Sequence, residues 1–282
     1  MSNAIIIQRS HAFIDRFDMI RSMIILLHSS KTMRTPSRSS KSLRQPTFLK
    51  EAIELDSYLK KLTVGRIASL MQLSKPMAAK THKLIANWTS DSARQTAAID
   101  CFLGDIYSGL QVQTFTAQDR TYADNHLYIL SGLYGVLRAL DCIYPYRFEM
   151  GYRPTVKKYH DLYKFWGDKI ANQLANDEPI INISSAEYDR VILPYVDQSR
   201  IIKPKFLTKN SATGEPTFVT VHAKVARGAF AHWLITQRIT KVSDLKHFDE
   251  INYHYDKSLS TEAEPVFVCD NFGGIGLSVR LT

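Results

Sequence analysis

Four charged residues lie within an otherwise apolar and aromatic stretch between residues 130 and 151: Arg138, Asp141, Arg147 and Glu149, with Arg153 just beyond it. A buried charge is costly unless an opposite charge accompanies it. Two arginines and two carboxylates in such surroundings therefore indicate either an ion-pair lock in the interior or a cleft that uses its charges. The residue types leave both arrangements open. In a cleft, the cations would hold a phosphate and a carboxylate would move a proton.

A second candidate site directly follows an apolar run. Residues 23–28 (MIILLH) have the composition of a buried strand, and the sequence SSKT comes next. Small polar and cationic residues at the end of a strand commonly bind anions. Lys31 and Thr32 are therefore predicted to contact phosphate, although a solvent-exposed Lys31 without any ligand explains the pattern equally well.

A third candidate site consists of His222, Lys224 and Arg227, where an expected strand gives way to an amphipathic helix over residues 224–240. Cations near a helix N-terminus are electrostatically unfavourable without an anion. A bound phosphate would offset that repulsion. Alternatively, Arg227 has a structural role and reaches back to a carboxylate such as Glu187.

Residues 45–95 are expected to form a helical subdomain. The spacing of apolar residues predicts helices over 48–62 and 66–73, and a third that begins after Ser74 and runs to residue 88. The tight connection at 63–66 contains a glycine. The first two helices thus have the organisation of a helix-hairpin-helix element.

Such a hairpin presents unpaired backbone N–H groups and the positive end of a helix dipole to a phosphate. Lys60, Lys61 and Arg66 lie beside Thr63 and Gly65 and add positive charge. Contacts of this kind grip the nucleic-acid backbone and do not read bases. Any pair of helices joined by a short turn can show the same pattern.

The other expected elements are short. Thr116 with Asp119 indicates a near capping box, and Ser184 with Glu187 is expected to cap a helix over 185–195. We expect strands over 128–133, 179–184, 200–207, 217–223 and 265–268, a helix or turn over 135–143, and a helix over 159–176. The irregular alternation predicts a mixed α/β (α+β) fold: a single compact domain with a central sheet surrounded by helices and a helix-hairpin-helix subdomain.

The chain contains 36 Lys and Arg against 27 Asp and Glu, a net charge of +9. This excess points to an anionic partner, nucleic acid first and anionic lipid second, although solubility alone also accounts for it. The cations gather at 31–50, 60–83 and 201–246, and they line a duplex-sized groove if these segments converge. The residues expected to contact DNA or another phosphate are Lys31, Thr32, Lys60, Lys61, Thr63, Gly65, Arg66, Lys80, Lys83, Arg138, Arg147, Lys203, Lys205, Lys224 and Arg227.

Cys101, Cys142 and Cys269 are far apart and have no zinc or iron–sulfur spacing. We interpret them as buried thiols of a reducing compartment. Redox sensing is the less favoured alternative, because it needs an exposed thiolate. No apolar run reaches the roughly 18–20 residues of a membrane span. We therefore expect a cytoplasmic protein with no cofactor, no metal and no membrane partner.

Several blocks of the sequence, in this order along the chain, resemble the YaaA family of peroxide-stress resistance proteins, also known as an uncharacterised family of the UPF0246 type. These blocks are SSKT, FLGDIYSGL, LSGLYGVLRALD with PYRFEMG, LYKFWG, NISSAEY, IIKPKF and HAKVARG. The similarity extends from Met23 to Cys269. We therefore expect residues 1–22 to be an N-terminal extension, residues 23–269 to form a YaaA-like domain and residues 270–282 to be a loose tail.

The resemblance implies a DNA-binding protein with an unusual mixed fold, linked to control of free iron and protection of DNA under peroxide. It also implies a helix-hairpin-helix element, although the family often has prolines at the turn where this chain has Val64 and Gly65. The family motif close to S-P-A-K-T keeps Lys31 and Thr32 here, whereas Ser29 stands in place of its proline and Ser30 in place of its alanine.

Two functions follow as hypotheses. In the first, the protein binds duplex or distorted DNA without sequence specificity through a basic cleft and the hairpin, and limits iron-driven oxidative damage. In the second, it is an enzyme acting on a nucleotide or nucleobase, with a small anionic ligand in a pocket lined by Lys31, Arg138, Arg147, Glu149, Lys224 and Arg227. Its catalytic candidates are Lys31, Asp141 and Glu149, but no recognised catalytic motif is present.

Overall fold

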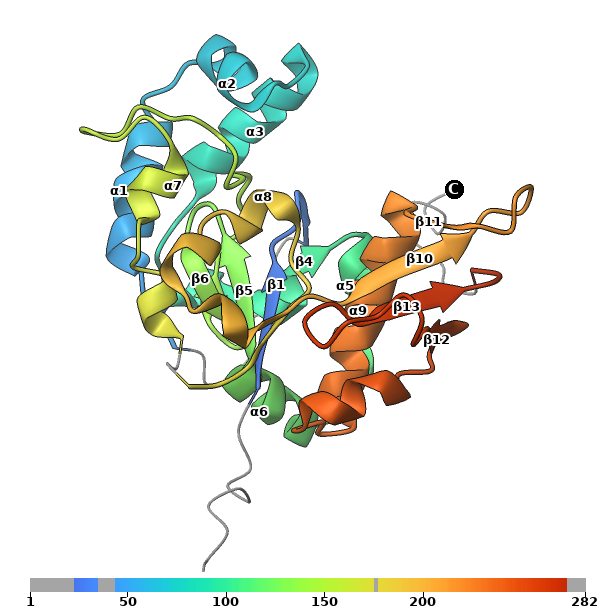
Figure 1. The fold of residues 1–282 in the computed structure, drawn as a ribbon. Coiled ribbons are helices and arrows are strands. Elements are labelled where there is room, and N and C mark those ends of the chain that lie inside the picture. Colours follow the sequence, from blue (N-terminus) through green and yellow to red (C-terminus); the bar gives the residue numbers. More distant parts are fainter. Residues whose placement is uncertain (1–22, 35–43, 175–176, 273–282) are drawn as a thin grey trace, which may run out of the picture.

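The computed structural model describes residues 23–34, 44–174 and 177–272. The expected extension at residues 1–22 and nearly all of the expected tail lie outside the described residues. Within the described part, two larger sheets and the surrounding helices make a mixed α/β fold (Figure 1). The mixed α/β class expected from the sequence is confirmed, whereas the expected single central sheet is corrected to two larger sheets.

The first sheet has the order β6-β5-β1-β8-β9. Its strands are β1 (Ile24–His28), β5 (Leu127–Ser131), β6 (Gly135–Arg138), β8 (Ile180–Asn182) and β9 (Ile201–Ile202). β1 lies between β5 and β8 and is parallel to both, and β9 is parallel to β8. All five residues of β1 are buried. A parallel strand covered on both faces reads as one continuous apolar run, which is why the sequence predicts this strand.

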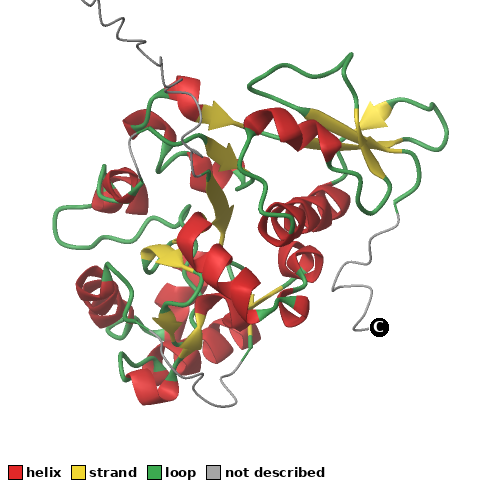
Figure 2. Cartoon of the chain, turned by 90° about the horizontal axis from the view of Figure 1, so that it is seen from below, coloured by secondary structure: helices red, strands yellow, loops and turns green. Residues whose placement is uncertain are grey.

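The second sheet has the order β11-β10-β13-β12. Its strands are β10 (Lys205–Lys209), β11 (Pro216–Thr217), β12 (Tyr253–Tyr255) and β13 (Val266–Cys269). Phe206 and Phe267 of this sheet pack against Phe230 of α9 (Thr220–Thr236) and against Phe248. Figure 2 shows helices lying around and between the groups of strands.

The remaining helices are α1 (Leu49–Leu59), α2 (Val64–Met71), α3 (Lys75–Asn87), α4 (Ala98–Cys101), α5 (Asp105–Leu110), α6 (Ala117–His126), α7 (Leu162–Trp166) and α8 (Ala186–Asp189). Short 3-10 turns occur at Ser92–Arg94, Val112–Thr114, Ala171–Gln173, Leu193–Tyr195, Gln198–Arg200 and Val242–His247. Two small strand pairs join β2 (Thr32–Met33) to β4 (Phe102–Leu103) and β3 (Thr96–Ala97) to β7 (Cys142–Ile143). Figure 1 shows α2 and α3 at one extremity of the molecule.

The local sequence signals identify several helix starts. Thr116 and Asp119 form the predicted capping box at α6, with the Asp119 backbone N–H donating to Thr116 Oγ1 and the Thr116 backbone N–H to Asp119. Thr63 caps α2 by accepting from the backbone N–H of Arg66. The three expected helices between residues 45 and 95 are present. The cap expected from Ser184 and Glu187 is wrong, because Ser185 begins α8 and Ser184 bonds to Asn182 and Asp189 instead.

Three other expectations are corrected. Residues 135–143 contain strands β6 and β7 and not a helix. The helix expected over 159–176 is reduced to α7, which ends at Gly167 with φ 51°, a backbone conformation suited to glycine. The strand expected over 217–223 stops early, because α9 already begins at Thr220.

Two glycines allow α5 and α9 to touch through their backbones. A Cβ atom added to Gly228 of α9 would lie 1.8 Å from the Ile106 carbonyl oxygen, and one added to Gly109 of α5 would lie 2.0 Å from the Val225 carbonyl oxygen. Backbone atoms on both sides leave no side chain that could move aside. The contact therefore requires glycine at both positions.

We predict that Gly228→Ala lowers the free energy of unfolding by about 1–3 kcal/mol, the usual cost of overpacking. The direction of this change is informative, because without an obstruction alanine stabilises a helix interior by about 1 kcal/mol relative to glycine, so the same substitution would raise the free energy of unfolding. Chemical denaturation measures the change.

The matched control is Gly65→Ala in α2, where an added Cβ would meet only Thr63 Oγ1, at 4.0 Å. This variant should be as stable as the unchanged protein or slightly more stable. If Gly228→Ala matched Gly65→Ala in stability, the close approach of α5 and α9 would be refuted.

Candidate functional site

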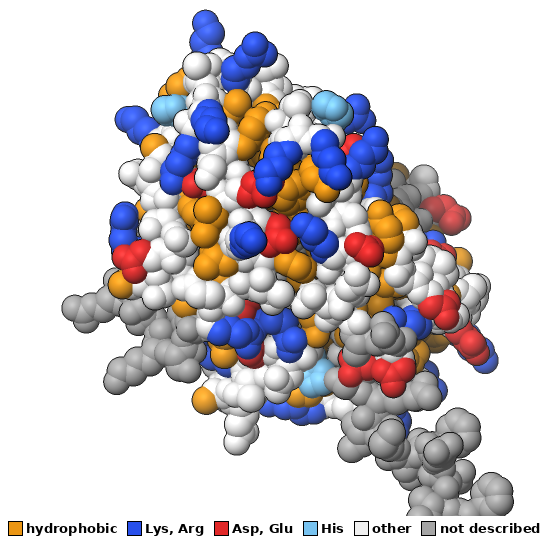
Figure 3. Space-filling view, turned by 90° about the vertical axis from the view of Figure 1, so that its left-hand side faces the viewer, with side chains coloured by type: hydrophobic (Ala, Val, Ile, Leu, Met, Phe, Trp, Pro, Cys, Tyr) orange, Lys and Arg blue, Asp and Glu red, His pale blue; other side chains and the backbone are white. Residues whose placement is uncertain are grey.

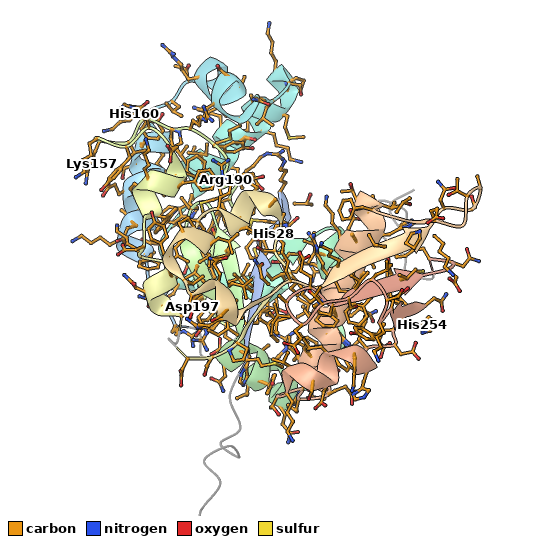
Figure 4. The ribbon with its side chains drawn as sticks, in the orientation of Figure 1. His28, Lys157, His160, Arg190, Asp197 and His254 are labelled. Carbon is orange, nitrogen blue, oxygen red and sulfur yellow. The ribbon has the colours of Figure 1, made fainter. Side chains whose placement is uncertain are left out.

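A cavity of about 330 Å³ opens at the carboxyl end of β1. Ligands of open α/β sheets characteristically bind at this edge. The cavity is lined by His28, Ser29, Ser30, Lys31, Thr32, Leu103, Gly104, Asp105, Ile106, Tyr107, Glu149, Ser185, Glu187, Tyr188 and Lys224. We call it the β1 pocket. His28, the last residue of β1, is labelled in Figure 4.

Five segments build the β1 pocket, one of which is the loop that carries Glu149. The turn after β1 supplies Ser29 to Thr32, and the start of α8 supplies Glu187 and Tyr188. The chain enters α5 through Gly104, whose φ of 111° is open to glycine and strained for other residues. Helix α9 contributes Lys224 from its second turn. The α5–α9 contact therefore fixes where Lys224 stands relative to β1.

Two unpaired lysines face the β1 pocket. Lys31 is exposed and Lys224 is half-buried. Neither forms an ion pair within the described part of the chain. Asp105 and Glu187 bring carboxylates to the same lining. Glu187 is held in place, because its Oε1 accepts a hydrogen bond of 2.7 Å from the backbone N–H of Gly151.

Glu149 is the carboxylic acid with a strongly shifted pKa in this pocket. It is buried, and burial together with the neighbouring charge of Glu187 raises its pKa to about 7. The positive charges of Lys31 and Arg147 act in the opposite direction. The Tyr188 hydroxyl donates to Glu149 Oε2 at 3.1 Å. Near neutral pH this carboxyl group can therefore hold or release a proton, as a general acid or base must.

A chain of buried hydroxyl groups leads to Glu149. Tyr188 donates to Glu149, and its oxygen lies 3.0 Å from Ser29 Oγ. Behind Ser29, the Tyr146 hydroxyl lies 2.6 Å from Ser131 Oγ at the end of β5. This chain fixes the orientation of Tyr188 and gives the proton of Ser29 a hydrogen-bonded route towards a carboxylate.

His28 lies against this chain and is uncharged. Its ring stacks on Tyr188 with 5.0 Å between centroids, and its carbonyl oxygen accepts from the Tyr107 hydroxyl. Burial, reinforced by the positive charges of Arg227 and Lys224, lowers the pKa of His28 to about 3. The imidazole is therefore neutral at physiological pH. Its buried Nδ1 has no hydrogen-bond partner among the described residues.

The charged residues of the stretch 130–151 do not share one environment. Some belong to a cleft and others to an interior ion-pair lock, the two arrangements that the sequence allows. Glu149 lines the β1 pocket, and Arg147 is close enough to influence its charge. Arg138 and Asp141 do not line the pocket. The Arg138 guanidinium donates to the Asp124 carbonyl oxygen and to the Tyr128 hydroxyl.

Asp141 belongs to an ion-pair lock. Its Oδ1 lies 2.7 Å from Arg44 Nε, and Arg44 also pairs with Asp124 at 2.6 Å. The Arg138 backbone N–H donates to Asp141 Oδ2 at 2.8 Å. Burial raises the pKa of Asp141 to about 6, with Arg44 opposing the shift. Asp141 and Arg138 thus join the segment before α1 to the first sheet, and neither reaches the pocket that the enzyme hypothesis assigned to them.

Of the cations near the helical hairpin that were predicted to contact phosphate, one is engaged within the protein and the others are exposed. Lys60 is engaged, because it pairs with Asp56 at 2.8 Å and donates to the Trp88 carbonyl oxygen. The other cations of this region, Lys61, Arg66, Lys75, Lys80 and Lys83, are exposed. Among the described residues none of these five forms an ion pair. In Figure 3, Lys and Arg side chains gather over the upper part of the face that carries α2 and α3.

The third basic segment is largely neutralised. Lys203 pairs with buried Asp189, and Lys205 pairs with Glu264 at 2.7 Å. Arg227 is half-buried behind the β1 pocket, where its charge acts on His28. Among the described residues, the cations of the three segments that stay without an ion pair include Lys31, Lys224 and those of α2 and α3. Most of the first basic segment, residues 35–43, lies outside the described residues.

Sequence reasoning did not single out His28, Tyr107 or Tyr188, and it left Ser29 open. These residues occupy or adjoin the blocks SSKT, FLGDIYSGL and NISSAEY, so the blocks themselves were the available signal. Histidine and tyrosine in apolar surroundings are indistinguishable from core residues without coordinates.

The three cysteines are buried, as predicted. Burial raises the pKa of the Cys101 thiol to about 12 and also raises that of Cys142. Across residues 23–34, 44–174 and 177–272, no group of three potential metal ligands comes together, and no helix is both long and apolar enough to cross a bilayer.

The fold and the pocket define a mixed α/β protein with a cavity at the carboxyl end of a parallel strand. A family model described as "Peroxide stress protein YaaA" matches residues 23–259. A UPF0246 protein of Salinispora tropica is 48% identical over 258 residues, which cover 92% of this chain and 98% of the relative. The chain therefore belongs to the YaaA family of peroxide stress proteins, as its sequence blocks indicated.

Glu149 predicts a specific dependence of stability on pH. Its pKa is about 7 in the folded protein against an ordinary value of 4.5. Between these values the unfolded chain loses a proton that the folded protein keeps, so stability falls as pH rises through this window. Glu149→Gln should remove that part of the fall, on the order of 3 kcal/mol between pH 4 and 8. Urea denaturation at a series of pH values measures it.

The control is the same substitution at exposed Glu262, which should leave the pH dependence of stability unchanged. Asp141 is present in every variant, so its contribution to the pH dependence of stability is the same in each and cancels in the comparison. Parallel curves for Glu149→Gln and the unchanged protein would show that folding does not shift the pKa of Glu149.

Proposed function

We propose that this protein binds DNA without sequence specificity and so limits iron-driven oxidative damage during peroxide stress. The observation that carries the proposal is the charge of α2 and α3. Residues 64–87 contain four cations, Arg66, Lys75, Lys80 and Lys83, and no acidic residue. All four are exposed. Unpaired cations on one projecting element are the electrostatic footprint of a phosphate-binding surface.

The helix-hairpin-helix interpretation is part of this proposal. Two turns are available, one before α2 and one before α3. At the first, Thr63 already accepts from the backbone N–H of Arg66. At the second, Ser74 begins α3 without a side-chain cap. Pro76 has no N–H, so the first turn of α3 offers the backbone N–H groups of Lys75 and Met77, as many as Val64 and Gly65 offer in α2. The turn before α3 differs in having Lys75 and Lys80 beside these donors.

The test is the salt dependence of binding to a random-sequence duplex. Each neutralised phosphate contributes about 0.9 to the slope of log K against log salt. Combined replacement of Arg66, Lys75 and Lys80 by Ala should weaken binding at least tenfold at low salt. It should also reduce the slope by about 2.7 if each cation contacts one phosphate. Fluorescence anisotropy measures both quantities.

The matched control removes three cations that are already paired. Lys157, Lys205 and Lys209 form ion pairs with Glu54, Glu264 and Asp270. Replacing these three lysines by Ala changes the net charge by the same amount and should change DNA affinity much less. An equal loss of DNA affinity in the two triple variants would contradict a specific role for α2 and α3. A DNA affinity that does not change with salt concentration would contradict binding through phosphate contacts.

A second candidate function is favoured by the β1 pocket. The connected Ser29, Tyr188 and Glu149 could move a proton, and Lys31 and Lys224 could hold an anion beside them. We propose on this basis an enzyme acting on a nucleotide or nucleobase. Relative to the expectation from sequence, Lys31, Glu149 and Lys224 remain in the proposed site. Arg147 and Arg227 do not line it and act on Glu149 and His28 through their charge, and Arg138 is left out.

A further inference from the structure

We propose that the β1 pocket binds a mononucleotide in one orientation, with its phosphate between Lys31 and Lys224 and its base directed inward to His28 and Glu149. This inference rests on the second proposed function and adds which end of the ligand each residue takes. It is independent of the DNA contacts proposed for α2 and α3. No recognisable sequence motif marks this binding mode.

The two lysines define the phosphate end. Lys31 stands on the turn after β1 and Lys224 on α9, nearly two hundred positions later in the chain. Both line the same cavity, and neither forms an ion pair within the described residues, although the charge of Lys31 acts on Glu149. Two unpaired ammonium groups facing one space repel each other, and an anion between them offsets that repulsion. A phosphate offers several oxygen atoms for both lysines at once.

His28 defines the inner end. Its side chain lies at the floor of the pocket with only 8% of the residue exposed. An uncharged imidazole carries one donor and one acceptor nitrogen, and Nδ1 has no partner here. A buried polar atom left unbonded costs about 1–3 kcal/mol. Nδ1 has no exposed surface, so a ligand recovers that loss when the imidazole turns towards the cavity, and an uncharged hydrogen-bonding edge suits this neutral ring.

The acidic groups favour a base over a simple anion. Besides the two lysines, the pocket is lined by Asp105, Glu149 and Glu187, with Arg147 and Arg227 acting from behind. A lining with both signs of charge suits a ligand that is anionic at one end and carries N–H donors at the other. Nucleobases carry such donors. The rings of Tyr188 and Tyr107 give the inner part flat walls.

The size of the cavity agrees with this ligand. A volume of about 330 Å³ is at the small end of the range typical of ligand sites, roughly 300–1,000 Å³. It accommodates a molecule with one ring system, a sugar and one phosphate. The pocket is open on the lysine side, since Lys31 is exposed, and buried on the side of His28.

The experiment is isothermal titration calorimetry of the full chain with the four ribonucleoside monophosphates, their nucleosides and inorganic phosphate. At least one monophosphate should bind at least tenfold more tightly than both its nucleoside and phosphate alone. Combined Lys31→Ala and Lys224→Ala should reduce that affinity at least tenfold while leaving nucleoside affinity within twofold. His28→Phe, which keeps an aromatic ring beside Tyr188, should weaken nucleoside and nucleotide alike.

The Lys157, Lys205 and Lys209 triple variant serves as the charge control and should bind the nucleotide normally. Absence of millimolar or tighter binding by any monophosphate would overturn the inference. The inference would also be overturned if inorganic phosphate bound as tightly as the nucleotide, or if the combined substitution of both lysines left the affinity for the nucleotide unchanged. The triple variant of Arg66, Lys75 and Lys80 separates the two proposals. If it loses DNA binding and keeps nucleotide binding, both proposals are supported. If it loses both, the two ligands share one surface and a separate nucleotide pocket is refuted.

Discussion

The contact between α5 and α9 is the constraint on which the arrangement of the candidate site depends. The two helices touch backbone to backbone at Gly109 and Gly228, with no room for a single added carbon on either side. One of these helices begins at the wall of the β1 pocket, and the other carries Lys224 into it. The packing of aromatic residues from the second sheet onto α9 is thereby coupled to the geometry of the first sheet. A shift of this contact would displace a cation that no nearby carboxylate holds in place.

The sequence was most informative where local chemistry decides the structure. The buried run of β1 and the reciprocal bonds of Thr116 with Asp119 depend on neighbouring residues, and both were predictable. Residues 135–143 were not, because β6 is a strand only through its pairing with β5, and Gly135 with φ 68° begins it directly after a tight turn. Family blocks marked the right segments of the pocket, whereas the identity of its inner residues depended on the fold.

Charge was the least predictable property, for a related reason. Net charge and clustering are visible in a sequence, but the partner of a given cation is not. Arg44 meets Asp124 and Asp141, and Lys205 meets Glu264, across long separations in the chain. The basic segment near the C-terminus therefore looked more open than it is. The α2–α3 region kept its charge because it contains no acidic residue of its own and projects away from the rest.

The burial of the three cysteine thiols has a consequence for a member of a peroxide stress family. Peroxide reacts with thiolates, and Cys101 is both shielded from solvent and held protonated by its surroundings. Such a side chain offers an oxidant neither access nor a nucleophile. Oxidation of its cysteines is therefore not the means by which this fold would respond to a burst of oxidant.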